Sequence, residues 1–114
     1  MSLEKLRKLS LPPEVFKALE ELVKALKERC DDVEVYLFGS YARGTWLEDS
    51  DIDLIVISKC FEGMGSEERY RYVRNLASKR LSFELLIYTP QEFEKVKKRS
   101  IVIQDAMEYW IKLT

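Results

Sequence analysis

The sequence contains no histidine and only two cysteines among its 114 residues. Without histidine the chain cannot build a Ser-His-Asp or Cys-His catalytic set, a histidine general base or most catalytic zinc sites. Cys30 and Cys60 stand far apart and form no CxxC pattern, so we expect reduced structural thiols. Any catalysis must therefore rest on carboxylates, hydroxyls, lysines or hard metal ions.

Long apolar runs and an excess of one charge are also missing. Nineteen basic and twenty acidic residues give a net charge of −1, which is not the charge pattern of a general nucleic-acid binder. There is no apolar run of about 18 residues, and the N-terminus lacks an apolar stretch of the signal-peptide type. We therefore expect a cytoplasmic protein with no membrane segment and no nucleic-acid partner.

The length of the chain suits one hydrophobic core, so we expect a single domain over residues 1–114. Residues 1–12 read as a short N-terminal helix or arm that stops at the prolines. Its apolar residues recur at a helical spacing: Leu3, Leu6 and Leu9. From Pro13 to about Arg29, one apolar stripe and one charged face predict an amphipathic helix.

The rest of the chain alternates between strand and helix patterns. The predicted strands cover residues 33–38, 51–58 and 83–88. Ser66 is expected to cap a helix with these residues inward: Tyr70, Val73, Leu76 and Ala77. Thr89-Pro90-Gln91-Glu92 has the spacing of a capping box and opens a helix to about Lys98. This order predicts a mixed α/β (α+β) fold, with one mixed sheet flanked by helices.

The tail, residues 100–114, leaves two alternatives open. It can form one continuous helix, or a helix followed by a short strand at 109–113. Its apolar side chains either pack in the core, which we favour, or form a docking surface. These side chains are Ile101, Val102, Ile103, Met107, Trp110, Ile111 and Leu113.

Two aspartates open the second predicted strand. Because side chains alternate along a strand, Asp51 and Asp53 are expected to project from the same face. Two like charges at the mouth of a buried strand need a cation nearby. Hard divalent cations take oxygen ligands, and Mg²⁺ binds one or two carboxylates together with water and substrate phosphates. The pair therefore predicts a metal site for phosphoryl chemistry.

The turn before this strand predicts the phosphate-binding half of the site. Gly39 lets backbone N–H groups approach an anion closely, and Ser40 adds a hydroxyl donor. Arg43 can contact a phosphate or pair with a neighbouring acid, and we favour the ion pair. Gly44 is expected to end a helix in a left-handed conformation.

Glu84 supplies a third carboxylate, since it is the only acid on its predicted strand. If that strand lies beside residues 51–58, Glu84 reaches the same end of the sheet. The other interpretation places Glu84 on a solvated face or in a salt bridge with an arginine such as Arg80.

These residues resemble a known family. G-S-Y-A-R-G, five residues, then S-D-I-D-L-I-V is similar to the signature of the DNA-polymerase-β-like nucleotidyltransferase superfamily, in its minimal, single-domain form. The motif covers residues 39–56, and a looser resemblance continues through Glu84 and the TPQEF that follows its strand.

The resemblance implies a role for each matching position. Asp51, Asp53 and Glu84 would be the catalytic carboxylates and ligands of a two-metal site holding Mg²⁺, or Mn²⁺ as the alternative. The implied nucleotide- and phosphate-binding residues are Gly39, Ser40, Arg43 and Ser50. The implied reaction transfers a nucleoside monophosphate, AMP from ATP, to an acceptor hydroxyl, with pyrophosphate leaving.

The sequence departs from the family at two points. Glu84 replaces the more usual aspartate, and no helical domain for base and acceptor follows the motif before Thr114. We therefore expect the acceptor to come from another chain or a second copy. Minimal members commonly pair with a helical HEPN-type protein, some as toxin and antitoxin, which implies such a partner here. The alternative is a catalytically weak, transferase-like module that neutralises a partner by binding.

Overall fold

The computed structural model of the chain describes residues 6–7 and 9–114. In chain order the elements are α2 (Pro13–Arg29), β1 (Glu34–Phe38), α3 (Gly39–Arg43), β2 (Ile52–Ile57), the 3-10 helix η1 (Lys59–Phe61), α4 (Ser66–Leu76), β3 (Phe83–Tyr88), α5 (Pro90–Val96), α6 (Ile101–Tyr109) and β4 (Ile111–Lys112). The predicted mixed α/β class is confirmed. In the described part of the chain, no helix is both long and apolar enough to cross a bilayer.

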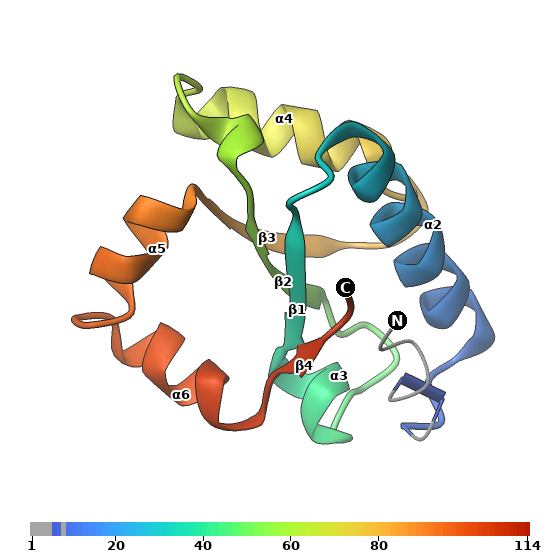
Figure 1. The fold of residues 1–114 in the computed structure, drawn as a ribbon. Coiled ribbons are helices and arrows are strands. Elements are labelled where there is room, and N and C mark those ends of the chain that lie inside the picture. Colours follow the sequence, from blue (N-terminus) through green and yellow to red (C-terminus); the bar gives the residue numbers. More distant parts are fainter. Residues whose placement is uncertain (1–5, 8) are drawn as a thin grey trace.

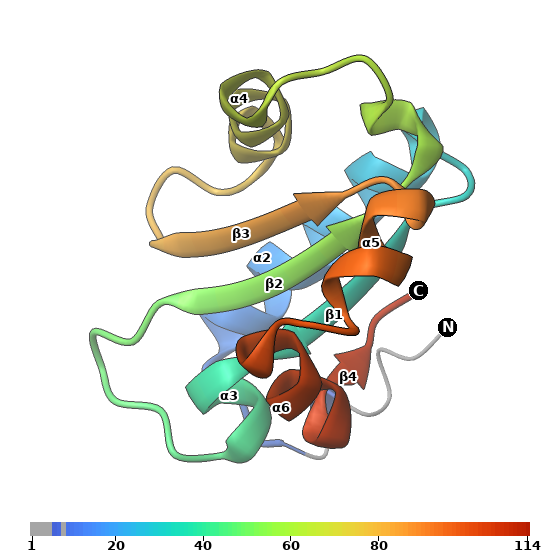
Figure 2. The same ribbon diagram turned by 90° about the vertical axis from the view of Figure 1, so that its left-hand side faces the viewer.

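The four strands form one mixed sheet in the order β3-β2-β1-β4. Strand β2 runs parallel to β3, whereas β1 is antiparallel to both β2 and β4. Figure 2 shows the starts of β2 and β3 at the same end of the sheet as α3. The tail forms the helix α6 and then the short strand β4, which is the second of the two alternatives left open by the sequence.

Helices cover both faces of the sheet, as Figure 1 shows. Along β2, Ile52, Leu54 and Val56 are buried against α2 and α4. The alternate side chains Ile55 and Ile57 pack on the other face, against α5 and α6. Because side chains alternate along a strand, Asp53 lies on the same face of the sheet as Ile55 and Ile57.

The helix signals in the sequence were mostly right. Pro13 opens α2, and the predicted capping box opens α5: the Thr89 side chain accepts from the Glu92 N–H, and the Glu92 side chain accepts from the Thr89 N–H. In the N-terminal arm, Leu6 is helical and fully buried, and Leu3 lies outside the described residues.

Two predictions about α4 were wrong. Gly65 rather than Ser66 is its N-cap residue. Tyr70 is 44% exposed, although Val73 and Ala77 are buried as predicted. The reason is that α4 packs against β3, the terminal strand of the sheet, so only a narrow stripe of its side chains is buried. Tyr70 lies outside this stripe and borders a surface groove with Leu85.

The tail divides its apolar side chains between the core and the surface. Ile103 and Leu113 are buried, which confirms core packing for these two residues. Ile101 is 82% exposed, and Val102 and Met107 are also exposed. The N-terminal part of α6 thus leaves an apolar patch on the surface.

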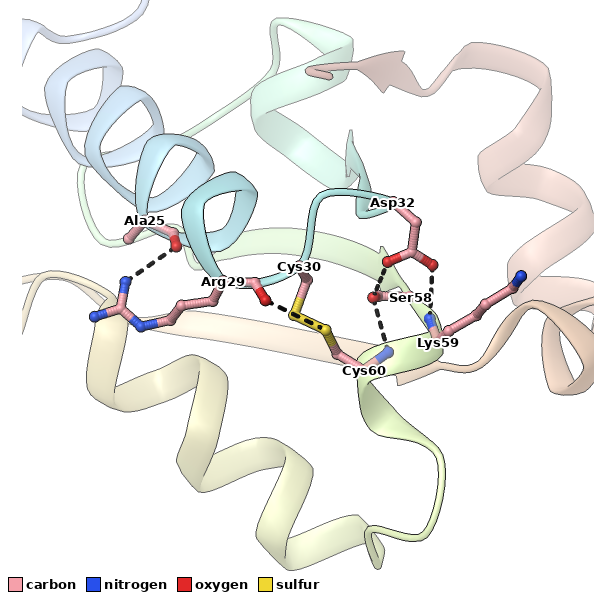
Figure 3. The surroundings of a disulfide bond; sticks show 7 residues. All are labelled: Ala25, Arg29, Cys30, Asp32, Ser58, Lys59 and Cys60. Atoms are coloured by element: carbon pink, nitrogen blue, oxygen red, sulfur yellow. Dashed lines mark hydrogen bonds between the residues drawn. A yellow bond between two sulfur atoms is a disulfide. The ribbon is translucent and has the colours of Figure 1, made fainter.

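The two cysteines form a disulfide, so the prediction of reduced thiols was wrong (Figure 3). Cys30 ends α2 and Cys60 lies in η1, and their Cα atoms are 5.9 Å apart. The antiparallel register pairs Glu34 with Ile57, so the segments before β1 and after β2 meet at one end of the sheet. A separation of 30 residues hides this proximity in the sequence.

Hydrogen bonds to Asp32 join the same two segments (Figure 3). The buried Ser58 hydroxyl donates to Asp32 Oδ1 at 2.6 Å, and the Lys59 N–H donates to Asp32 Oδ2 at 2.8 Å. The Lys59 N–H is the main reason that the pKa of Asp32 is lowered, followed by the Ser58 hydroxyl. The disulfide and this cluster therefore stabilise the end of the sheet opposite to the predicted site.

Candidate active site

Asp53 and Glu84 are neighbours on parallel strands. The register of β2 and β3 pairs Asp53 with Glu84, as predicted for a third acid from an adjacent strand. Both lie on the sheet face that carries Ile55 and Leu86, which α5 and α6 cover. Glu84 is also exposed, and no ion pair with Arg80 occurs in the described part of the chain. Its place beside Asp53 is confirmed, and its role as a metal ligand stays a prediction.

The surroundings of Asp53 disfavour its negative charge. Burial raises the pKa of its carboxyl to about 7, and the hydrogen bond to Glu84 and the charges of Glu84 and Asp51 add to this. A carboxyl in an apolar, acidic environment holds its proton until a cation arrives. Near neutral pH the pair is therefore electrostatically prepared for a positive ion.

Gly39 touches the Asp53 carboxylate from the opposite side. The register of β1 and β2 pairs Phe38 with Asp53, and the chain turns directly after Phe38 with Gly39 at a φ of 74°. A side chain at Gly39 would overlap Asp53 Oδ2. Position 39 therefore requires glycine for two reasons: its backbone is left-handed, and the Asp53 carboxylate fills the space of a side chain.

Asp51 lies at the edge of this arrangement. It precedes β2, is exposed, and acts on Asp53 through its charge. Across residues 6–7 and 9–114, no three His, Cys, Asp or Glu side chains lie close enough together to hold a metal ion. The structure therefore brings Asp53 and Glu84 together, and the three acids are not a preassembled metal cluster.

The predicted phosphate-binding turn is the start of α3. Ser40 is half-buried, and its carbonyl accepts the N–H groups of Gly44 and Thr45. Gly44 ends α3 with a φ of 77°, which confirms the predicted left-handed terminator. The Gly39 N–H donates to the hydroxyl of Tyr109 at 3.0 Å.

Arg43 follows the alternative that we favoured, the ion pair. Its Nη2 donates to Asp105 Oδ2 at 3.0 Å, and its guanidinium lies 3.9 Å from the centre of the Tyr109 ring. Both partners belong to α6. Sequence reasoning missed this group, because Tyr109 and Asp105 lie in the ambiguous tail and no local pattern links them to residue 39.

Ser50 has a structural partner within its own loop. Its Oγ accepts the Leu47 N–H at 2.7 Å, and its carbonyl accepts the Tyr41 hydroxyl at 3.4 Å. These bonds hold the segment that leads into Asp51. The phosphate contact expected for Ser50 stays a prediction.

Comparison with known proteins supports the resemblance. A family model described as a nucleotidyltransferase domain matches residues 19–109. A Methanocaldococcus jannaschii protein named "putative protein adenylyltransferase" is 31% identical over 93 residues, covering 78% of this chain and 89% of that protein. A second protein with this name from the same organism is 49% identical over 43 residues, which are 36% of this chain and 29% of that protein. The shared segment thus spans less than a third of that second relative.

Solved structures share the fold. A crystal structure described as a "putative nucleotidyltransferase" from Sulfolobus solfataricus has a TM-score of 0.55 and 27% identity, covering 84% of this chain and 78% of that chain. A crystal structure described as "the toxin-antitoxin with AMP-PNP" has a TM-score of 0.60 over 84% of this chain and 72% of that chain. Its identity is 23%, so it shows the fold alone. The family match and the relative aligned along most of its length establish that this chain belongs to the nucleotidyltransferase family of enzymes.

Proposed function

We propose that the chain is a Mg²⁺-dependent nucleotidyltransferase that transfers AMP from ATP to a hydroxyl group of a partner protein, with pyrophosphate leaving. The observation that carries the proposal is the position of the Asp53 carboxylate, between Glu84 on β3 and the Gly39 turn. The carboxylates that would bind a metal therefore lie beside the turn that would bind a phosphate. The name of the relative aligned along most of its length supports ATP as the nucleotide and a protein as the acceptor.

The acids suit a hard divalent cation. None of the ion pairs in the described part of the chain includes Asp51, Asp53 or Glu84. Carboxylate oxygens are the ligands that Mg²⁺ takes, and Mn²⁺ accepts the same set. We propose that these three residues hold two ions. Bound ions would neutralise the charge that develops on the triphosphate and orient its oxygens.

The remaining residues position the two substrates. The Gly39–Ser40 turn would receive the triphosphate, since Ser40 offers a hydroxyl and the backbone N–H groups that follow it at the start of α3 have no partner within that helix. Glu84 is exposed on β3, the terminal strand of the sheet, so an acceptor hydroxyl can approach it from outside. Glu84 would accept a hydrogen bond from that hydroxyl and orient it toward the α-phosphate. Catalysis would then consist of positioning and charge neutralisation.

For the acceptor we propose a HEPN-type helical protein, as the resemblance implies, with a second copy of this chain as the alternative. The exposed apolar side chains Ile101 and Val102, at the start of α6, support a protein contact. An ATP-dependent role supports a cytoplasmic location. The Cys30–Cys60 disulfide is unusual for this location, since stable disulfides in intracellular proteins occur mainly in hyperthermophiles.

A second candidate function is a transferase-like module that neutralises its partner by binding. The dispersed acids favour it, because no three of them gather in the described residues. The double variant Asp51→Asn with Asp53→Asn separates the two functions when it is co-expressed with the HEPN-type partner. The binding module predicts an intact complex and full neutralisation. The transferase predicts an intact complex and lost neutralisation.

Nucleotide binding tests the proposal without any acceptor. Mg²⁺ with ATP at a hundredfold excess over the dissociation constant should stabilise the fold by about 2.7 kcal/mol. Asp53→Asn should remove most of this gain, whereas Asp49→Asn, on the exposed loop before the site, should keep it. Absence of stabilisation by every NTP with Mg²⁺ or Mn²⁺ would contradict the proposed function.

A further inference from the structure

We infer that Tyr109 is a positioning residue whose hydroxyl fixes the Gly39–Ser40 turn against Asp53. The Gly39 N–H donates to Tyr109 Oη at 3.0 Å across 70 residues of sequence. The functional part of this inference rests on the proposed nucleotide-binding role of the turn. Tyr109 would act through the turn and not on the substrate.

The turn needs an external partner because its conformation is demanding. Gly39 has a φ of 74°, and the Asp53 carboxylate fills the space that a Cβ at Gly39 would need. The helix that follows, α3, has five residues and gives the first N–H of the turn no partner of its own. The Tyr109 hydroxyl supplies this partner and ties the start of α3 to the end of α6.

Tyr109 is itself restrained by its neighbours, since it is partly buried and packs against both core clusters. The Arg43 guanidinium lies 3.9 Å from the centre of its ring, and Arg43 donates to Asp105 one helical turn earlier on α6. The next residue, Trp110, stacks on Tyr36 with ring centres 3.8 Å apart. The Tyr109 ring therefore has little freedom, which is what a hydroxyl that fixes a turn requires.

This arrangement gives Arg43 an indirect role. Its guanidinium is engaged by Asp105 and by the Tyr109 ring, both on α6. Arg43 then stabilises the orientation of Tyr109, which in turn holds Gly39. Of the two interpretations of Arg43 that the sequence allows, the ion pair is thus the one that connects it to the site.

The test uses Tyr109→Phe, which removes only the hydroxyl. Tyr36→Phe is the matched control, because it also removes a bonded tyrosine hydroxyl, which donates to Glu34, from the neighbouring aromatic stack. Hydrogen exchange of the Gly39 amide, followed by NMR, should become about fivefold to tenfold faster in Tyr109→Phe. The Ile55 amide in β2 should not change. Equal Gly39 exchange in Tyr109→Phe and the unaltered protein would overturn the inference.

The affinity for Mg²⁺ with the ATP analogue AMP-PNP gives the functional readout. Tyr109→Phe should weaken it by about fivefold to tenfold, and Tyr36→Phe by less than about twofold. An unchanged affinity in Tyr109→Phe would overturn the functional part. If the unaltered protein bound no AMP-PNP, the proposed function would fail, while the exchange measurement would still decide the role of Tyr109.

A double-mutant cycle tests the order Arg43, Tyr109, Gly39. Arg43→Met should speed Gly39 exchange in the unaltered background and have no further effect in Tyr109→Phe. Additive effects would overturn the indirect role of Arg43. Asp105→Asn, on the exposed side of α6, should speed Gly39 exchange less than Arg43→Met does. If Tyr109→Phe does not fold, these two variants test the inference, and unchanged Gly39 exchange in both would overturn it.

Discussion

The Asp53 carboxylate occupies the space that a side chain at Gly39 would need. This contact joins the end of β1 to the start of β2, and the positive φ of Gly39 turns the backbone toward the acid. Binding of a phosphate at the turn would bring it beside the carboxylates that hold its counter-ion. The geometry of one glycine thus connects the two halves of the proposed site.

Gly39→Ala should therefore destabilise the protein more than an ordinary glycine substitution. An alanine at a left-handed φ costs about 1–2 kcal/mol by itself, and here its methyl group also displaces Asp53. We expect a total loss of about 3 kcal/mol or more in urea unfolding, together with lost AMP-PNP binding.

Gly63→Ala is the matched control for this substitution. Gly63 has a similar φ of 80°, but no atom lies within 4 Å of an added Cβ. It should lose only the backbone contribution, about 1–2 kcal/mol, and keep its nucleotide affinity. Equal losses in the two variants would contradict the contact between Gly39 and Asp53.

The raised pKa of Asp53 predicts a pH-dependent stability in EDTA. The pKa is near 4 in the unfolded chain and about 7 in the folded protein, so the folded state binds the proton more tightly. The stabilisation is present below about pH 4 and is lost as the pH rises through about 7. Between pH 5 and pH 8 the unfolding free energy should fall by roughly 1–2 kcal/mol, discounted for solvent screening.

Asp53→Asn should remove this slope and be more stable than the unaltered protein at pH 8. Asp49→Asn, on the exposed loop, should keep the slope. Urea titrations at pH 5, 6.5 and 8 measure both. A slope that survives in Asp53→Asn would show that another group carries the titration.

The pair Arg69 and Glu92 stabilises the junction of α4, β3 and α5. The Arg69 side chain is 12% exposed and donates to both Glu92 oxygens and to the carbonyls of Met64 and Ile87. Arg69→Met removes all of these hydrogen bonds, while Glu92 Oε1 keeps only the Thr89 N–H, and should cost about 2–4 kcal/mol. Arg71→Met, whose side chain is 73% exposed, should cost less than about 0.5 kcal/mol. Thermal unfolding at pH 7 compares the two, and equal effects would refute this ranking.

The same pair predicts acid sensitivity. Arg69 is the main cause that lowers the pKa of Glu92 to about 2, and the Thr89 N–H adds to it. A lowered pKa in the folded state means that the stabilisation is present above about pH 4.5 and is lost as the pH falls toward 2. Arg69→Met should therefore show a flatter decline of stability between pH 5 and pH 2.5.

The Cys30–Cys60 disulfide should contribute stability without affecting the site. A crosslink that closes a loop of about 30 residues is worth roughly 3.6 kcal/mol in the loop-entropy model. Dithiothreitol, or Cys30→Ser with Cys60→Ser, should lower the unfolding free energy by this amount and leave AMP-PNP affinity unchanged. Two titratable thiols in native protein purified without reductant would contradict the disulfide.

Local patterns in the sequence were sufficient to predict much of the fold. The alternation along 51–58 placed Asp53 on one face with Ile55 and Ile57, and the capping box located the start of α5. Glu84 could be placed beside Asp53 because a lone acid in an apolar strand indicates a neighbouring polar site. In each case the signal lies within a few residues of the feature that it predicts.

Contacts between distant segments could not be predicted in this way. Cys30 and Cys60 meet only because β1 and β2 are antiparallel with a specific register. Tyr109 reaches Gly39 only because the chain returns through α6 to β4, and the tail pattern allowed two structures. Tyr70 was misplaced since a helical period does not reveal how wide the packed stripe is.

Transfer of labelled nucleotide to the proposed HEPN-type partner tests the central claim most directly. With Mg²⁺, the partner should acquire label from ATP labelled at the α-phosphate and none from ATP labelled at the γ-phosphate. Asp53→Asn and Glu84→Gln should abolish the transfer, and Asp49→Asn should preserve it. Label from the γ-phosphate, or α-label transfer that survives Asp53→Asn, would contradict a nucleotidyltransferase that works through this site.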